Sequence, residues 1–566
     1  MNSAGDIPAL MQAAKRAVDS GDLQGIERAF RRLTELMPND ARVHFNHSRS
    51  LSDLGRFTEA EAGLRRALQL APDLPQANTN LGNMLTRTGR LAEAEPYLRR
   101  SARLQPRSWN AHYNLAGLLH RHGRIDEARR SVDTALSLAV DAIEAHQLRL
   151  LLALYSGEVA DQELFALHRA AADAIARQNA LPLKFHVNHP DPERRLRIGY
   201  VSPDLRAHSV AYFVEGILAA HDRDQVEVFC YSDADRSDDV TTRLRGLADH
   251  WRDTRRLNLD QLAGQIGTDR IDVLIDLAGH TRDNRMGLFA RKPAPLQATW
   301  IGYPATTGLD TIDIRFTDAI VDPPGASDTF HSETLVRLEP CFLAYTPPAD
   351  TPEPGDCPAL RGEGPVFGSF NNIAKLSVAT LETWAAVLKA APDAKLVLKS
   401  PGVLDAQSFE GFTRILAAAG VAIERVEFLP YASSMAEHLA LYRRVDVALD
   451  TFPYNGTTTT CEALLMGVPV IALHGGRHAG RVGQSLLQAA GLEEFVAADR
   501  EAYIAKAAAL IRDRARIGQL RQDLRGRLLA SPLCDAPSLT RQVEAAYRQF
   551  WRQWCRRQSA SQTETV

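Results

Sequence analysis

A period of 34 residues runs through the first quarter of the chain and restricts what this part can fold into. Glycine, proline and alanine keep the period, at Gly21, Gly55, Gly89 and Gly123, at Pro38, Pro72 and Pro106, and at Ala60, Ala94 and Ala128. Each unit is long enough for two short helices, with the glycine between them and the proline closing the second. Such units bury their apolar faces against their neighbours, so the pattern predicts an α-helical solenoid.

The period and the residues that keep it resemble tetratricopeptide repeats, about four of them over residues 1–141. Asparagine holds one register of the period, at Asn46, Asn80 and Asn114, on the expected first helix of each unit. It is an indifferent helix former, and its amide both donates and accepts hydrogen bonds. A column of asparagines along the inner face would suit gripping the backbone of an extended peptide. A polar position tolerated on a solvated groove is the alternative.

Residues 142–194 keep helical periodicity without the repeat and are expected to form a helical cap and linker. From residue 195 onward, short apolar segments alternate with helical stretches. The segments predicted as strands are 197–202, 226–231, 271–276 and 298–302, and then 366–370, 395–399, 425–429, 447–449 and 468–472. This alternation predicts α/β architecture with two Rossmann-like lobes, at 195–350 and 351–566, and a cleft at the carboxyl ends of the strands. The last helix is expected to dock back on the first lobe.

The segment from Asp450 to Gly467 predicts a phosphate site. It combines a strand end, a turn at Asn455 and Gly456, and a helix that opens with a run of threonines. Free backbone N–H groups gather where a helix begins, and the helix dipole adds about half a unit of positive charge there. Glu462 lies one turn further in, within reach of the hydroxyls of a neighbouring sugar. The pattern suits a nucleotide-sugar diphosphate held without a metal, and an ordinary capped helix is the alternative.

Composition argues against several other classes of protein. The formal net charge is −3, from 66 basic and 69 acidic residues that are interspersed, so no surface for nucleic acid is expected. The chain has no apolar run of about 18 residues to cross a membrane, and its N-terminus lacks the pattern of a signal peptide. The six cysteines lack metal-ligand spacing, which indicates reduced thiols in the cytoplasm.

The two lobes and the segment at 450–467 resemble B-type glycosyltransferases, and the repeats narrow this to a resemblance to the protein O-GlcNAc transferase family. The motifs that carry it are Ile198-Gly-Tyr-Val-Ser-Pro-Asp204 with His208, Leu277-Ala-Gly-His-Thr281, Pro293-Ala-Pro-Leu-Gln297, Ile301-Gly-Tyr-Pro-Ala-Thr-Thr-Gly308, Phe370-Asn-Asn-Ile-Ala-Lys375 and Leu449-Asp-Thr-Phe-Pro-Tyr-Asn-Gly456. The resemblance covers nearly the whole chain. It implies an inverting enzyme that moves GlcNAc from UDP-GlcNAc to Ser or Thr hydroxyls of polypeptides.

In the second lobe the resemblance implies a UDP-binding set, made of Asn371, Asn372, Lys375, Ala432, His438, Thr457, Thr458, Thr459 and Glu462. Lys375 matches the family's essential lysine, whose ammonium would stabilise the departing diphosphate. His438 matches a histidine that stacks on uracil, and the loop around Ala432 would offer backbone hydrogen bonds to the base. Glu462 matches a ribose-binding carboxylate. Animal members carry histidine at the position of Thr457, so this chain departs from the pattern there.

In the first lobe the resemblance implies a catalytic set, with Lys375, of His208, Asp276 and His280, and a sugar pocket of Thr281, Gly302, Tyr303 and Pro304. Asp276 and His280 lie four residues apart, at a strand end and in the loop beyond, so both are expected to reach the cleft. Inversion requires the acceptor hydroxyl to lose its proton. His208, His280, Asp276 acting through water, and a phosphate oxygen of the donor are the candidate bases, and the sequence leaves them open.

No metal or other cofactor is expected, with UDP-GlcNAc as the donor substrate. The two Asp-x-Asp pairs, Asp222 with Asp224 and Asp233 with Asp235, lie in polar loops. The asparagine column favours a polypeptide acceptor. One alternative is a UDP-sugar transferase for a glycan or lipid-linked acceptor, with the repeats as an assembly platform. Another is a tetratricopeptide adaptor that only senses UDP-GlcNAc.

Overall fold

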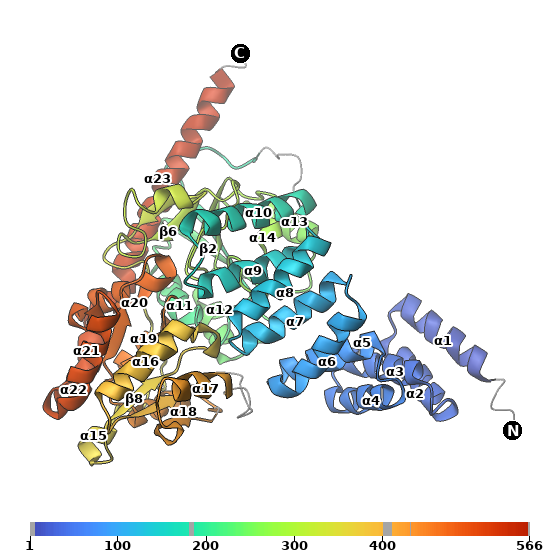
Figure 1. The fold of residues 1–566 in the computed structure, drawn as a ribbon. Coiled ribbons are helices and arrows are strands. Elements are labelled where there is room, and N and C mark those ends of the chain that lie inside the picture. Colours follow the sequence, from blue (N-terminus) through green and yellow to red (C-terminus); the bar gives the residue numbers. More distant parts are fainter. Residues whose placement is uncertain (1–5, 180–185, 400–409, 431, 564–566) are drawn as a thin grey trace. The chain divides into compact units, whose positions relative to one another are not determined.

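The computed structural model describes residues 6–179, 186–399, 410–430 and 432–563 (Figure 1). The chain divides near residue 140 into two compact units, and each is described by itself. Part of the predicted linker, residues 180–185, lies outside the described residues. Among the helices that are described, none combines the length and the apolar character that crossing a membrane requires.

The first unit is a succession of helical pairs. Its helices are α1 (Asp6–Ser20), α2 (Leu23–Leu36), α3 (Ala41–Asp53), α4 (Phe57–Leu70), α5 (Pro75–Arg87), α6 (Leu91–Leu104), α7 (Trp109–Arg121) and α8 (Ile125–Leu138). The glycine of each repeat lies between the two helices of a pair. The φ angles of these four glycines are +70°, +75°, +77° and +71°, in the left-handed region that favours glycine. The predicted α-helical solenoid is confirmed.

The arginines that follow the turn glycines tie each repeat to the one before it. Arg90 donates to Glu61 of the preceding repeat at 2.8 Å and to Glu93 of its own repeat at 2.8 Å. Arg56 and Arg124 make the corresponding pair of contacts, each with one glutamate of the preceding repeat and one of its own repeat. The period of 34 therefore also specifies a ladder of ion pairs between neighbouring repeats.

We expect Arg90→Ala to lower the free energy of unfolding of the repeats by about 0.5–1 kcal/mol. The effect is small because the Arg90 side chain is 39 % exposed, so water screens its ion pairs. Added salt should shrink the difference further. Urea unfolding of the full chain measures it, with Arg107→Ala, at an exposed position, as the matched control. An equal loss in that control would contradict a specific role for the ladder.

The second unit contains two parallel sheets. The first consists of β1 (Leu196–Ser202), β2 (Val226–Ser232), β3 (His250–Asp253), β4 (Val273–Asp276), β5 (Leu296–Thr299), β6 (Ile314–Thr317) and β7 (Thr334–Arg337), in the order 3-2-1-4-5-6-7. The second consists of β8 (Val366–Ser369), β9 (Lys395–Leu398), β10 (Val426–Phe428), β11 (Val447–Leu449), β12 (Val470–Leu473) and β13 (Val496–Ala497), in the order 10-9-8-11-12-13. The order reverses between β1 and β4 and between β8 and β11. Ligands of doubly wound sheets bind at such switch points, and the predicted α/β architecture is confirmed.

The sheets contain four strands that the sequence pattern did not predict. β3 and β7 lack a continuous apolar run, because residues such as His250 and Thr334 are partly or fully exposed along them. β6 contains the buried Arg315, and β13 is only two residues long. The predicted strand at 298–302 is wrong in its second half. The chain leaves the sheet after Thr299, and Ile301 takes a positive φ of 64°.

Helices surround these sheets. They are α9 (Ile143–Tyr155), α10 (Asp161–Asn179), α11 (Ala211–Ala220), α12 (Asp239–Leu247), α13 (Leu259–Asp269), α14 (Met286–Phe289), α15 (Pro358–Arg361), α16 (Val378–Ala390), α17 (Glu410–Ala418), α18 (Met435–Ala440), α19 (Thr458–Leu465), α20 (His478–Ala489), α21 (Arg500–Arg512), α22 (Arg514–Leu529) and α23 (Ala536–Thr563). The long α23 contacts the first lobe, where the Tyr547 hydroxyl lies 3.1 Å from that of Tyr200. It also contacts the linker before that lobe, where the Trp551 indole donates to Asp191 O at 2.8 Å.

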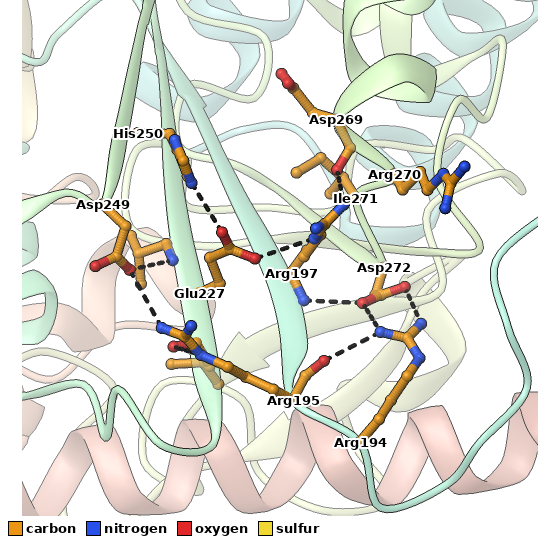
Figure 2. A network of polar contacts seen from close by, with 12 residues as sticks. Arg194, Arg195, Arg197, Glu227, Asp249, His250, Asp269, Arg270, Ile271 and Asp272 are labelled. Atoms are coloured by element: carbon orange, nitrogen blue, oxygen red, sulfur yellow. Dashed lines mark hydrogen bonds and ion pairs between the residues drawn. The ribbon is translucent and has the colours of Figure 1, made fainter.

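The amino ends of β1, β2 and β4 are held by a network of charges (Figure 2). Asp272, just before β4, accepts the backbone N–H of Arg197 at 2.8 Å and the guanidinium of Arg194 at 2.8 Å. Glu227 on β2 joins Arg197 at 3.0 Å and His250 at 2.8 Å. This network fixes the edge of the sheet opposite the carboxyl ends, where the predicted site residues lie.

Candidate active site

The carboxyl ends of β8 and β11 bring the predicted lysine to the turn before α19. Lys375 lies in the short helical turn after β8, and its Nζ donates to Asn455 O at 2.8 Å. The same ammonium lies 4.3 Å from the centre of the Tyr454 ring. Burial lowers the pKa of Lys375 to about 8, against the attraction of Asp450. A cation is therefore held, partly desolvated, beside the turn that precedes the predicted phosphate site.

Asp450, at the end of β11, organises that turn. Its Oδ1 accepts the backbone N–H of Gly456 at 2.7 Å and that of Thr451 at 2.8 Å. Burial raises the pKa of Asp450 to about 7, against these hydrogen bonds and the attraction of Lys375. The sequence interpretation used Asp450 only as a strand end. An acidic residue inside an apolar motif was the signal that could have identified it.

The start of α19 has little room for side chains. A Cβ on Gly456 would lie 2.5 Å from Thr459 Oγ1 and 2.9 Å from Asn371 Oδ1. The Thr459 hydroxyl donates to Asn371 Oδ1 at 2.9 Å, which ties the helix start to the end of β8. Thr457 is the N-cap residue, and within the described chain its side chain makes no capping hydrogen bond. Asn372 is exposed and caps the turn at Ala374 N, so it contributes less directly than Asn371.

His438 lies between two charged side chains. Its Nδ1 is 2.7 Å from Lys399 Nζ, and its Nε2 is 3.0 Å from Glu462 Oε2. Because an ammonium only donates, Nδ1 accepts and Nε2 carries the proton that it donates to Glu462. The Tyr442 hydroxyl adds a 3.5 Å contact to Glu462. The ring of His438 is thus fixed in tautomer and orientation.

Lys399 was missing from the predicted site. It follows β9 directly, is 6 % exposed, and burial lowers its pKa against the attraction of Glu462. A lysine that ends an apolar strand segment was a usable signal, since lysine is rarely buried without a partner. Ala432 lies in the loop before α18, half-buried, next to residue 431, which is outside the described residues.

The first lobe contributes His208, just after β1. Its Nδ1 is 3.6 Å from Asp204 Oδ1, and it accepts the backbone N–H of Val210 at 3.3 Å. Burial lowers the pKa of His208, while the neighbouring Asp204 opposes that shift. The side chain is 40 % exposed. His208 is therefore a titratable base candidate that solvent or a ligand can reach.

Asp276 and His280 are both buried, and they differ in whether all of their side-chain polar atoms have hydrogen-bond partners. The two Asp276 oxygens accept from Ala278 N at 3.0 Å, Gly279 N at 2.8 Å and the Thr299 hydroxyl at 2.8 Å. His280 Nε2 donates to Thr307 O at 2.7 Å, and its Nδ1 has no hydrogen-bond partner among the described residues. Burial lowers the pKa of His280 to about 4. Asp276 thus holds the loop, and His280 presents a weakly basic lone pair.

The predicted sugar-pocket loop is closely packed. A Cβ on Gly302 would lie 1.9 Å from Leu277 O, so the two backbone segments pack too closely to leave room for a side chain at this position. The Tyr303 hydroxyl lies 2.9 Å from Nε2 of His168, whose Nδ1 donates to Leu164 O at 2.7 Å. The hydroxyl of Thr281 donates to Ala278 O at 2.7 Å. His168 was missing from the predicted site, because it lies in α10 of the helical cap.

The two lobes meet at these residues. Tyr454 of the second lobe packs against a core that contains Tyr303 of the first lobe and Leu154 of the cap. Its ring lies 5.0 Å from that of Tyr155. The Ser485 hydroxyl donates to Asp318 across the lobes at 2.6 Å. Lys375, which contacts Tyr454, is thereby placed at the boundary with the histidine-bearing lobe.

Two parallel sheets in tandem, with a lysine and a helix start at one switch point and a histidine at the other, give the two-lobe arrangement expected for a B-type glycosyltransferase. Comparison with protein families matches residues 163–344 and 359–543 to glycosyl transferase family 41. Residues 11–75, 45–108 and 85–152 match tetratricopeptide repeats. The chain belongs to glycosyl transferase family 41.

Named relatives agree with this assignment. The chain is 41 % identical over 427 residues to the probable UDP-N-acetylglucosamine–peptide N-acetylglucosaminyltransferase SPINDLY of Solanum lycopersicum, covering 74 % of this chain and 45 % of that protein. It is 32 % identical to the corresponding protein SEC of Arabidopsis thaliana, covering 69 % and 41 %. The chain thus spans about half the length of the curated relatives it matches.

A solved structure matches over almost the full length. It is a mutant of the O-GlcNAc transferase of Thermobaculum terrenum, with a TM-score of 0.82 and 38 % identity, covering 98 % of this chain and 99 % of that one. The predicted membership of the O-GlcNAc transferase family is confirmed.

Proposed function

We propose that this chain transfers GlcNAc from UDP-GlcNAc to Ser and Thr hydroxyls of polypeptides, with inversion at the anomeric carbon. The observation that carries the proposal is Lys375, held 2.8 Å from Asn455 O beside the start of α19. Phosphate oxygens of the donor would occupy that helix start, where N–H groups and the dipole favour negative charge. The names of the relatives supply the donor and the peptide acceptor.

In this proposal the second lobe binds UDP. Uracil stacks on His438, and Glu462 accepts hydrogen bonds from the ribose hydroxyls. Asn371 and Thr459 hold the helix start in place, and Lys375 neutralises charge that develops on the β-phosphate as the glycosidic bond breaks. The loop Gly302, Tyr303 and Pro304 bounds the sugar.

We assign the general base to His208. Asp204, 3.6 Å away, favours the imidazolium that forms when His208 takes the acceptor proton. Burial makes His280 a much weaker base, and the carboxylate oxygens of Asp276 are occupied by three hydrogen bonds. His280 then serves as an acceptor for a hydroxyl of the bound sugar, through its unpartnered Nδ1.

We propose that the repeats bind the acceptor polypeptide. Asn46, Asn80 and Asn114 lie half-buried on α3, α5 and α7, the first helices of successive repeats. Asn80 also lines a groove of about 350 Å³ together with Asn83 and Arg87. Their amides can hold an extended backbone. All six cysteines are free thiols, which supports a reducing, cytoplasmic setting with protein partners there.

Transfer of labelled sugar onto total protein of a plausible host, in EDTA, tests this proposal. A panel of UDP- and GDP-linked sugars should show UDP-GlcNAc as the preferred donor. Label released by mild alkaline β-elimination from protein bands, and absent with Lys375→Ala, would support it. Binding of UDP-GlcNAc without protein labelling would favour a sensor, and label confined to glycan or lipid fractions would favour another acceptor.

Lys399→Met is expected to raise KM for the donor about tenfold with little change in kcat, because uridine is bound alike in the ground and transition states. The change leaves His438 Nδ1 without its donor, so the ring that stacks on uracil loses its fixed orientation. Initial rates against donor concentration measure it. Lys399→Arg should recover most of the affinity, and Lys395→Met, at the exposed first position of β9, is the matched control. A fall in kcat at unchanged KM would refute this role.

A further inference from the structure

The helix α20 connects the first lobe to the turn before α19. Two of its side chains contact the loop that follows β6 in the first lobe. His478 Nδ1 lies 2.8 Å from Asp322 Oδ2, and the Ser485 hydroxyl donates to Asp318 Oδ2 at 2.6 Å. Positions seven apart lie two turns along one face of a helix, so α20 is fixed to the first lobe at two points.

The contact between His478 and Asp322 is a buried, charged hydrogen bond. The two side chains are 5 % and 2 % exposed. Burial would raise the pKa of Asp322, but the attraction of His478 and its hydrogen bond hold that pKa well below its usual range. Asp322 is therefore ionised and accepts a hydrogen bond from Nδ1–H. The Thr317 hydroxyl also donates to Asp322, and the centres of the His478 and Phe342 rings are 5.1 Å apart. These contacts hold the first turn of α20 in one position.

The backbone of the same helix contacts the turn at Asn455. The N–H of Asn455 donates to Ala479 O at 2.8 Å, and the N–H of Gly483 donates to Asn455 Oδ1 at 3.1 Å. The two segments approach closely, since a Cβ on Gly480 would lie 2.7 Å from Pro453 O. Because Asn455 is also fully buried, a shift of the first turn of α20 displaces this turn as well.

Asn455 links α20 to the lysine. Two of its polar atoms are bonded to the helix, and its carbonyl oxygen accepts Lys375 Nζ at 2.8 Å. We propose that His478 is a positioning residue for the transfer reaction. Held by Asp322, it fixes the start of α20 and, through Asn455, the ammonium of Lys375. This role rests on the proposed function, in which that ammonium contacts the diphosphate.

The position of Lys375 therefore depends on a carboxylate of the other lobe. A misplacement of about 1 Å in an active site costs up to about 100-fold in rate. Loss of the hydrogen bond between His478 and Asp322 releases only the first turn of α20, because Ser485 still holds the helix to Asp318. We therefore expect a smaller effect, of about tenfold on kcat.

Transfer kinetics of His478→Phe test this role. The phenylalanine keeps a ring against Phe342 but cannot donate to Asp322, so kcat should fall about tenfold while KM for UDP-GlcNAc changes less than about threefold. His478→Asn should recover most of kcat, because its side-chain amide can donate to Asp322 from nearly the same position. His189→Phe, at an exposed position of the linker, is the matched control and should change nothing.

Two double variants separate positioning from a general loss of structure. In a Lys375→Ala background, His478→Phe should lower kcat less than about twofold further, because the group that it positions is gone. His478→Phe combined with Asp322→Leu leaves neither member of the pair alone in the core, and replacing a buried ion pair by apolar residues is often neutral for stability. This second double variant should show the same fall in kcat as His478→Phe by itself.

The affinity for UDP relative to uridine, measured by calorimetry, needs no transfer. Lys375→Ala and His478→Phe should each weaken UDP binding at least about fivefold and leave uridine binding unchanged, since only UDP has a β-phosphate. Bound uridine also shows that the second lobe is folded.

A natural chain that transfers no sugar, with these affinities as expected, would refute the proposed function and still support the role of His478. Natural kcat and natural UDP affinity in His478→Phe would overturn that role alone. An equal fall of kcat in the natural and the Lys375→Ala backgrounds, or a His478→Asn variant as slow as His478→Phe, would overturn it too.

Discussion

Lys375→Ala is expected to lower kcat by two or more decades, on the order of a lost charge contact in the transition state. The ammonium lies beside the turn that precedes α19, where it donates to Asn455 O at 2.8 Å. Negative charge builds on the diphosphate only as the sugar leaves, so the loss falls mainly on kcat and less on KM. Single-turnover transfer from labelled donor measures the chemical step directly.

Lys389→Ala, at an exposed position of α16, is the matched control and should leave the rate unchanged. The fold should tolerate the loss of Lys375, since its burial already disfavours the charge. A Lys375→Ala rate within threefold of the natural chain would remove this residue from the mechanism and the proposed diphosphate contact with it.

The pH dependence follows from the same burial. Lys375 is cationic below its pKa of about 8 and neutral above it in the free chain. The donor diphosphate is an anion, which raises the pKa of Lys375 once bound. We therefore expect kcat/KM to fall as pH rises through about 8, and kcat to fall only at higher pH, because these parameters report the free and bound states.

Much of the fold follows from short-range pattern. The 34-residue period specifies helix pairs because glycine at a positive φ and proline after a helix act locally. Apolar strands in the middle of each sheet were predicted, such as β8, which is buried throughout, and β1, which is buried at every position but Arg197. The strand β3, at the edge of its sheet, was not predicted. Part of it faces solvent, so polar residues are tolerated there and it lacks a continuous apolar run.

The site residues were predictable where they lie close together in the sequence and form a local turn. Asn455, Gly456 and the threonines of α19 lie within a few residues of one another, and the turn they form is local. Lys399 and His438 are 39 residues apart, and His168 and Tyr303 are 135 apart. Those pairs exist only because parallel strands gather at one edge and α10 packs on the first lobe. No periodicity in the sequence encodes such a contact.

His208→Ala is expected to lower kcat by about 10²–10⁴, the usual contribution of a positioned general base. In the natural chain kcat/KM should rise with pH as His208 loses its proton. Because burial lowers the pKa of His208, this rise should occur below the ordinary histidine pKa of about 6.5. His208→Ala should therefore lower kcat and also abolish the rise of kcat/KM with pH on the acidic side of the profile. The decline above about pH 8, which belongs to Lys375, should persist.

His280→Gln separates the two histidines. The glutamine amide can still donate to Thr307 O, as His280 Nε2 does at 2.7 Å, so the loop is retained. Because burial lowers the pKa of His280 to about 4, it contributes little as a proton acceptor near neutrality. We therefore expect kcat to fall less than about tenfold, with the acidic limb of kcat/KM unchanged. If His280→Gln instead removed that limb and His208→Ala preserved it, the base would be His280, and Asp204 would serve only to hold the loop after β1.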